Sequence, residues 1–253
     1  MANGGVLTLH CGARRVEEGE LEQYLAPQPQ GRWYPIAHSR VLQIAKTSLA
    51  EAGYEIQKME LGVTKEGNRF FGVMNLASQL VPGVCLAIGI RSSVDKSFPL
   101  GFCAGQRVFC CDNLAFRSEL IVKKRHTLNG ERNFVGAIAG AVSQLAAFKE
   151  VEARRIEQMK ELTLTADHAD SLILRAYERE IIGARDLPWV LREWRNPGYP
   201  EFQDRTIWTL FNAFTSALSD RAEMQPVAYA QQTMRLNQLL LPAPKEIQAV
   251  NAA

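Results

Sequence analysis

Apolar residues in the first half of the chain recur first at helical spacing and then in short runs. Between Ser39 and Gly53 the spacing predicts a helix, with Ser39 as its cap and Gly53 as its stop. Four runs follow, at residues 54–63, 70–76, 84–90 and 101–111, and each predicts a strand. Because the connections between these runs are short, we expect them to form an antiparallel meander.

Three finer signals lie within these runs. The strand at 54–63 is irregular near Lys58, and Gly105 is a candidate bulge in the strand at 101–111. The run at 84–90, VCLAIGI, is apolar on both faces and therefore predicts a central strand.

The second half of the chain returns to helical spacing. A long helix is predicted from about Gly130 to Leu162, with Asn129 as its cap. Gly136 and Gly140 keep one side of this helix narrow, so we expect that side to pack against the sheet. Shorter helices are predicted at residues 167–182, 189–194, 206–219 and 227–241.

The fold class that follows is α+β, with a sheet of three to five antiparallel strands packed against the long helix. We divide the chain into an irregular N-terminal segment (1–37), an α+β core (38–162), a helical C-terminal part (163–241) and a tail (242–253). An apolar content of 47% with 22% charged residues is that of a globular protein.

Several features of the sequence predict a cytoplasmic protein. No apolar run approaches the ~18 residues of a membrane span, and the first residues do not resemble a signal peptide. Among the five cysteines, Cys110 and Cys111 are adjacent, a spacing that disfavours a disulfide between them, so we expect reduced thiols.

Positive charge is concentrated in the middle of the chain. Residues 86–132 carry eight basic and four acidic side chains, whereas the whole chain has a net charge of +2. Such an excess is typical of a phosphate-binding surface, although it also occurs on solvated surfaces that only keep a protein soluble. The candidate nucleic-acid-binding residues are Arg91, Lys96, Arg107, Lys123, Lys124, Arg125, His126 and Arg132. Four phenylalanines lie among them, Phe98, Phe102, Phe109 and Phe116, most of which we expect in the core.

Motifs that define a chemistry are missing from the sequence. Cys103, Cys110 and Cys111 with His126 have spacings that do not fit a zinc site, so we expect neither metal nor cofactor. No phosphate-binding glycine loop or nucleophile elbow occurs. An enzyme remains an alternative because polar groups recur at strand ends: Arg91, Asp95, Asp112, Asn113, Arg125 and His126.

Four stretches, in chain order, resemble one protein family. They are WYPIAH at 33–38, LAIGIRSSVDK at 86–96, RVFCCDNLAF at 107–116 with RHT at 125–127, and TIWTLFNAFT at 206–215. Together they are similar to the phage- and plasmid-borne family called domain of unknown function 932. The resemblance implies a protein of a mobile genetic element or a bacterial cytoplasmic protein, and it implies no particular reaction.

Three functions therefore remain open. The first is a non-enzymatic factor that binds or anneals single-stranded nucleic acid, since the predicted order of elements is similar to that of Rad52-like annealing proteins, which assemble into rings. The second is an interaction or anti-defence regulatory protein without catalysis. The third is an enzyme with the strand-end residues as its site. In the first case we expect single-stranded nucleic acid as partner, a homo-oligomer and no membrane.

Overall fold

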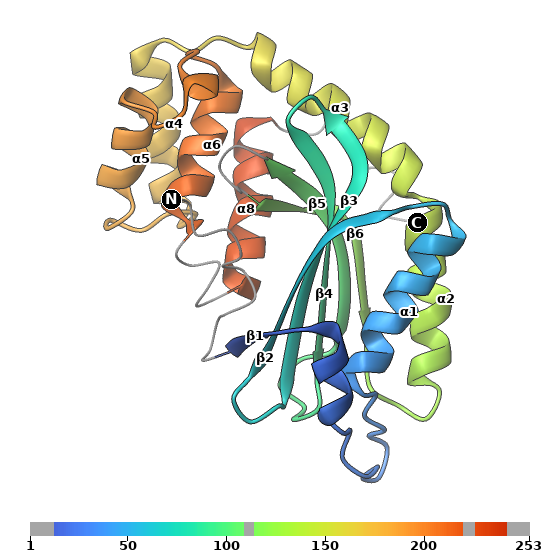
Figure 1. Cartoon of the computed structure of the whole chain (residues 1–253). Helices are drawn as coiled ribbons and strands as arrows, with labels where there is room; N and C mark the ends of the chain where they lie inside the picture. The colour runs from blue at the N-terminus through green and yellow to red at the C-terminus, as the bar shows by residue number, and fades with distance from the viewer. Residues whose placement is uncertain (1–12, 109–113, 220–225, 242–253) are drawn as a thin grey trace.

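The computed structural model describes residues 13–108, 114–219 and 226–241, and it has an α+β fold (Figure 1). One curled sheet contains six antiparallel strands, each paired with its neighbours in sequence. The strands are β1 (Ala13–Val16), β2 (Ile56–Thr64), β3 (Arg69–Val81), β4 (Val84–Ser93), β5 (Leu100–Val108) and β6 (Leu114–Lys124). The sheet is thus wider than the three to five strands that the sequence predicts.

The four predicted strands correspond to β2 through β5. Pairing of β2 with β3 shifts register between Ile56 and Lys58, where the sequence predicts an irregularity. Pairing of β5 with β6 shifts between Cys103 and Gly105, next to the predicted bulge. The apolar strand β4 lies in the interior of the sheet, between β3 and β5. Cys110 and Cys111 fall outside the described residues.

Two helices replace the single long helix predicted for residues 130–162. Helix α2 (Gly130–Ser143) and helix α3 (Leu145–Glu161) are bent by 47° at Gln144. The cause is local, because the Gly140 carbonyl accepts hydrogen bonds from Ser143 Oγ (2.8 Å) and Gln144 Nε2 (3.2 Å). The Gln144 N–H donates instead to the Ala141 carbonyl (3.1 Å), which tightens the turn and ends α2.

The glycine side of α2 does not face the sheet, so that prediction is wrong. A Cβ built on Gly136 or on Gly140 would meet no atom within 4 Å, and both residues are exposed. The buried side of α2 carries larger residues, among them Phe134, Ile138 and Val142. Large apolar side chains gain more from burial than glycines do, and they determine which side of the helix packs inward.

Helix α1 (His38–Glu51) packs beside α2, and both cover the same side of the sheet (Figure 1). Its N-cap is Ala37, so the predicted cap Ser39 lies inside the helix. A 3₁₀ helix, η3 (Glu18–Gln23), connects β1 to the loop before α1.

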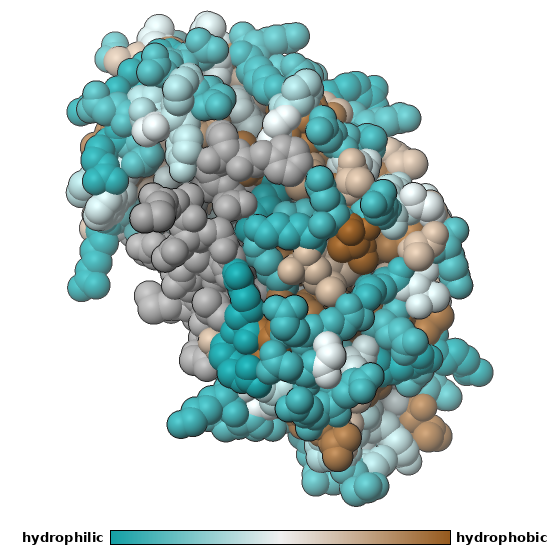
Figure 2. Space-filling view, in the orientation of Figure 1, coloured by the Kyte–Doolittle hydropathy of each residue, from teal (hydrophilic) through white to brown (hydrophobic). Residues whose placement is uncertain are grey.

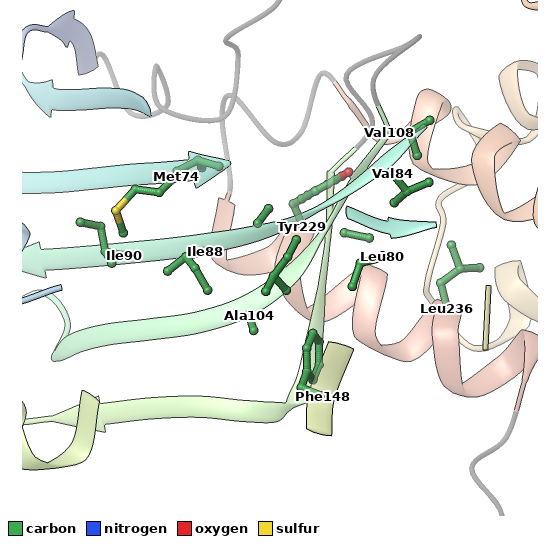
Figure 3. Packing of buried hydrophobic residues seen from close by; sticks show 14 of the residues in the cluster. Met74, Leu80, Val84, Ile88, Ile90, Ala104, Val108, Phe148, Tyr229 and Leu236 are labelled. Carbon is green, nitrogen blue, oxygen red and sulfur yellow. The ribbon is translucent and has the colours of Figure 1, made fainter. Parts of the chain in front are cut away.

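The remaining helices contribute residues to the hydrophobic core that begins at the sheet. They are α4 (Ala166–Glu178), α5 (Leu187–Arg195), the 3₁₀ helix η4 (Pro200–Phe202), α6 (Ile207–Ala217) and α8 (Pro226–Leu240). Figure 3 shows Tyr229 of α8 and Phe148 of α3 beside strand residues such as Val84 and Ala104, all members of one buried cluster. Hydrophobic packing therefore continues from the sheet into the helical part.

Across the described ranges, no single helix has the length and apolar character needed to cross a membrane, although α2 and α3 together, as a bent pair, meet these criteria.

Candidate nucleic-acid interface

The two faces of the sheet differ sharply in chemistry. Residues that pair directly across antiparallel strands share a face, and neighbouring rows alternate between faces. One row joins Leu61, Gly72, Ile90, Phe102 and Val122. The next row joins Arg15, Gly62, Phe71, Arg91, Gly101 and Lys123. The first row contains no charged residue, whereas the second contains Arg15, Arg91 and Lys123 beside Phe71 and two glycines.

Positive charge gathers at one end of the sheet, and we call it the basic end. It is formed by residues 30–40, 64–69, 93–100 and 124–132, at the lower end of Figure 1. These segments carry eight Lys and Arg residues but only three carboxylates. Figure 2 shows this end as mainly hydrophilic, with a few apolar side chains. The basic end therefore has a net positive charge larger than that of the whole chain.

Hydrogen bonds between backbone groups and between side chains hold the four segments together. The Tyr34 N–H donates to the His126 carbonyl (3.3 Å), and the Val94 N–H donates to the Asn68 carbonyl (2.8 Å). Lys96 Nζ donates to Gln30 Oε1 (3.1 Å). Residues distant in sequence are thereby fixed at one place.

Two of the three carboxylates are already neutralised by arginines. Arg40 of α1 pairs with Glu131 of α2 (2.7 Å), and Arg69 pairs with Asp95 (2.8 Å). Across the ranges that the structure describes, six cations of the basic end have no carboxylate partner: Arg32, Lys65, Lys96, Lys124, Arg125 and Arg132. Lys123, which directly precedes Lys124, is also exposed. These cations are available for an external anion.

Aromatic rings lie among the cations. The Lys96 ammonium is 4.8 Å from the centre of the half-buried Trp33 ring. The backbone of Lys96, in the turn after β4, has a positive φ of 68°. Phe98 is half-buried and packs on Phe71, with ring centres 5.3 Å apart. Phe102 is in the core, and Phe109 lies outside the described residues.

His126 is a structural residue, and the structure argues against its predicted role as a phosphate-binding cation. It is buried, and its Nδ1 accepts a hydrogen bond from the Ile36 N–H (3.1 Å). Burial lowers the pKa of His126, so the ring is neutral near pH 7. This histidine attaches the loop before α1 to the connection between β6 and α2.

A second buried histidine stabilises the same end of the sheet. His38 Nε2 lies 3.0 Å from the Gly67 carbonyl, and the ring stacks on Phe70. Burial lowers the pKa of His38 to about 4. His38 thereby joins the start of α1 to the turn between β2 and β3.

Arg107 must also be removed from the predicted binding set. Its side chain is buried and pairs with Glu60 Oε2 (3.2 Å), with Asn75 Oδ1 3.4 Å away. Burial pushes the pKa of Glu60 upward, but Arg107 and Lys58 outweigh this effect and the pKa lies below its usual value. Arg107 is committed to an internal ion pair and cannot reach a phosphate in solution.

Of the residues proposed for an enzyme, the two that the structure describes as a potential acid–base pair, Asp95 and His126, are hydrogen-bonded to other groups. Asp95 accepts hydrogen bonds from Arg69 Nε and from the Ser97 N–H (2.9 Å), whereas the Nδ1 of His126 is bound to the Ile36 backbone. Asp112 and Asn113 lie outside the described residues. Among the residues that are described, no group of three metal-binding side chains occurs, and Cys103 is a free thiol.

Sequence reasoning missed the part of the basic end contributed by earlier segments, including Arg32, Arg40, Lys65 and Arg69. The signal that could have found them is topological. In a meander, every second turn lies at the same end of the sheet, so the turns at 64–69 and 93–100 and the residues after β6 must meet.

Searches against protein-family models, curated proteins and solved structures find no match. The family resemblance therefore depends on its four sequence stretches alone.

Proposed function

We propose that this protein binds single-stranded nucleic acid without catalysis, through the basic end of its sheet. The observation that supports the proposal is the group of exposed cations without carboxylate partners, of which Lys96, Lys124 and Arg125 come from two neighbouring connections. Lysine and arginine side chains neutralise phosphates and release counterions, an interaction that needs no particular base sequence.

Half-buried aromatic rings favour a single strand over a duplex. Trp33 lies beside Lys96, Phe98 lies beside Arg91, and Tyr34 is half-buried in the same loop as Trp33. Unpaired bases stack on aromatic side chains, whereas bases in a duplex are not accessible for such stacking. The proposed ligand is therefore a single strand whose phosphates contact the cations.

Salt dependence provides the first test. Binding of a fluorescent oligo-dT should weaken with salt, with a log–log slope of about −0.7 per phosphate contact. Three to five contacts give a slope of roughly −2 to −3.5, and a duplex of equal length should bind more weakly. A wild-type protein that binds no oligonucleotide at low salt would refute the proposal.

Charge reversal provides the second test. Changing Lys123, Lys124 and Arg125 together to Glu should abolish binding without unfolding the protein, because all three side chains are exposed. A matched control reverses Arg175 and Arg185, which are exposed in the helical part, together with Arg154 on α3. Equal losses in both variants would mean that only net charge matters and that the basic end has no special role.

An interaction protein without catalysis is the second candidate, favoured by the outer side of α2 and α3. Residues 133–148 contain no charged side chain, and Val135 is 40% exposed. A second copy of this chain would fit the homo-oligomer that the sequence predicts. Measurement of mass in solution by light scattering tests this candidate, and a monomer at high concentration would contradict it.

The four motif stretches support assignment of the protein to a mobile genetic element. Annealing of single strands is a reaction that such elements require during recombination, and it needs binding along a strand rather than a catalytic centre. The rate of annealing between complementary oligonucleotides tests this proposal: wild-type protein should increase the rate, and the charge-reversed variant should not.

A further inference from the structure

Arg91 occupies an unusual position on the charged face of the sheet. It belongs to β4 and pairs with Gly101 of β5. A Cβ added to Gly101 would lie 2.9 Å from Arg91 Cγ and 3.0 Å from its Nε, so the arginine side chain lies directly over this glycine. The Phe98 ring lies against the guanidinium, 5.2 Å from its Cζ to the ring centre. The side chain is thus positioned by its neighbours rather than free in solvent.

Lys123 approaches the same place from the opposite strand. It pairs with Gly101 from the β6 side, so its side chain projects from the same face as that of Arg91. Cys103, two residues further along β5, also lies on this face, and burial raises the pKa of its thiol to about 12. Both Arg91 and Lys123 oppose that rise, as expected for two cations near one point of the sheet.

Among the side chains that the structure describes, no carboxylate balances the charge of the Arg91 guanidinium. Within the described ranges, it forms no hydrogen bond and no ion pair. Asp95, in the following turn, is bound by Arg69 and by the Ser97 N–H. Burial lowers the pKa of Arg91, Cys103 opposes this effect, and no carboxylate among the described residues does so. A half-buried cation with unused donors is a group that an external anion would stabilise.

We propose that Arg91 and Lys123 form a phosphate-binding site over Gly101, which receives one phosphodiester of the bound single strand. This inference rests on the proposed function, and it adds a defined contact to a surface otherwise described only by its charge. The planar guanidinium offers two parallel N–H donors to phosphate oxygens, and the lysine supplies a second charge. Gly101 leaves room for the Arg91 side chain to lie over the strand, since a Cβ at this position would displace it.

A charge-neutral substitution separates this site from a diffuse positive surface. Gly101→Ala keeps every charge but places a methyl group where the Arg91 side chain lies. We expect it to weaken oligo-dT binding by about tenfold to a hundredfold, the effect of losing one charge-assisted contact. Arg91→Lys retains the charge but loses the two-donor geometry, and it should weaken binding similarly. Gly136→Ala is the matched control, because nothing lies within 4 Å of its Cβ position.

Inorganic pyrophosphate is the second probe, measured by calorimetry with the full-length protein. Circular dichroism establishes that each variant is folded, and Arg91→Gln replaces Gly101→Ala if the latter does not fold.

Weaker binding of oligo-dT by the Gly101 or Arg91 variants, with an unchanged control, supports the site. Wild-type affinity for oligo-dT in the folded Arg91 variants overturns it, while the proposed function stands. If wild type binds pyrophosphate through Arg91 but binds no oligonucleotide, the phosphate site is upheld and the proposed function fails. If wild type binds neither probe, both fail.

Discussion

Replacement of Arg107 by methionine tests whether this residue stabilises the fold or binds ligand. The substitution leaves Glu60, whose side chain is 3% exposed, without its main partner, and Lys58 Nζ at 2.9 Å is then its remaining cation in the described residues. Removal of one member of a buried ion pair costs about 3–5 kcal/mol. For a chain of this size, each kcal/mol lowers the Tm by about 2–4 °C, so the expected loss is roughly 6–20 °C.

The pH dependence of this loss identifies its cause. In the wild type, the lowered pKa of Glu60 stabilises the folded state above the usual carboxyl pKa, and this stabilisation is lost as the pH falls through the folded value. In Arg107→Met, burial should instead raise the pKa of Glu60, so the carboxyl takes up a proton at a higher pH. The free-energy difference between the two proteins should therefore be largest near pH 7 and smaller near pH 4.

Urea unfolding followed by circular dichroism at both pH values measures this difference. Lys124→Met is the control, and we expect it to change stability by less than about 0.5 kcal/mol because the side chain is exposed. Oligo-dT affinity of folded Arg107→Met should equal that of the wild type. An equal destabilisation at pH 7 and pH 4, or a loss of binding without a loss of stability, would refute the ion-pair argument.

Three further predictions concern other parts of the molecule. Gly140→Ala should stabilise the protein by about 0.5–1 kcal/mol in urea unfolding, since the position is open and alanine favours a helix; destabilisation would show that this side of α2 is packed. His38, with a pKa of about 4, should make stability fall as pH decreases from about 6.5 toward 4, because the unfolded chain takes up the proton first. The slope should be smaller in His38→Gln, and an identical pH profile would contradict the assignment. Cys103 should react slowly with iodoacetamide at pH 8, as followed by mass spectrometry, because its thiol pKa is raised to about 12; rapid alkylation would contradict that value.

The sequence predicted the elements whose apolar period is strong, and it failed where the period is weak. The strands from β2 to β5 and helix α1 follow clear patterns, whereas β6, with LAFRSELIVKK, places charged residues between apolar ones and was not predicted. The buried side of α2 was predicted wrongly because glycines carry no hydrophobic signal that shows which side of a helix packs inward. The break at Gln144 was missed because it arises from two side chains that bond to one carbonyl.

The candidate site was predicted only in part. A count of charges along the chain located Lys123, Lys124 and Arg125, which the structure leaves exposed. The same count included Arg107, and its burial depends on Glu60, a residue 47 positions away in the chain. Arg32 and Lys65 were omitted because they join the basic end only through the arrangement of the strands. Charged residues can be counted along a sequence, but whether one of them has an ion-pair partner in a distant segment is known only from the fold.

Pairing of each strand with its predecessor has a consequence for the emergence of this chain from the ribosome. Every strand after β2 finds its hydrogen-bonding partner already synthesised, so the sheet can grow one strand at a time. The loop before α1 is different, because the Ile36 N–H donates its hydrogen bond to His126, which is synthesised 90 residues later. Completion of the basic end must therefore await the last strand of the sheet, and the nascent chain carries an incomplete binding surface until translation has passed His126.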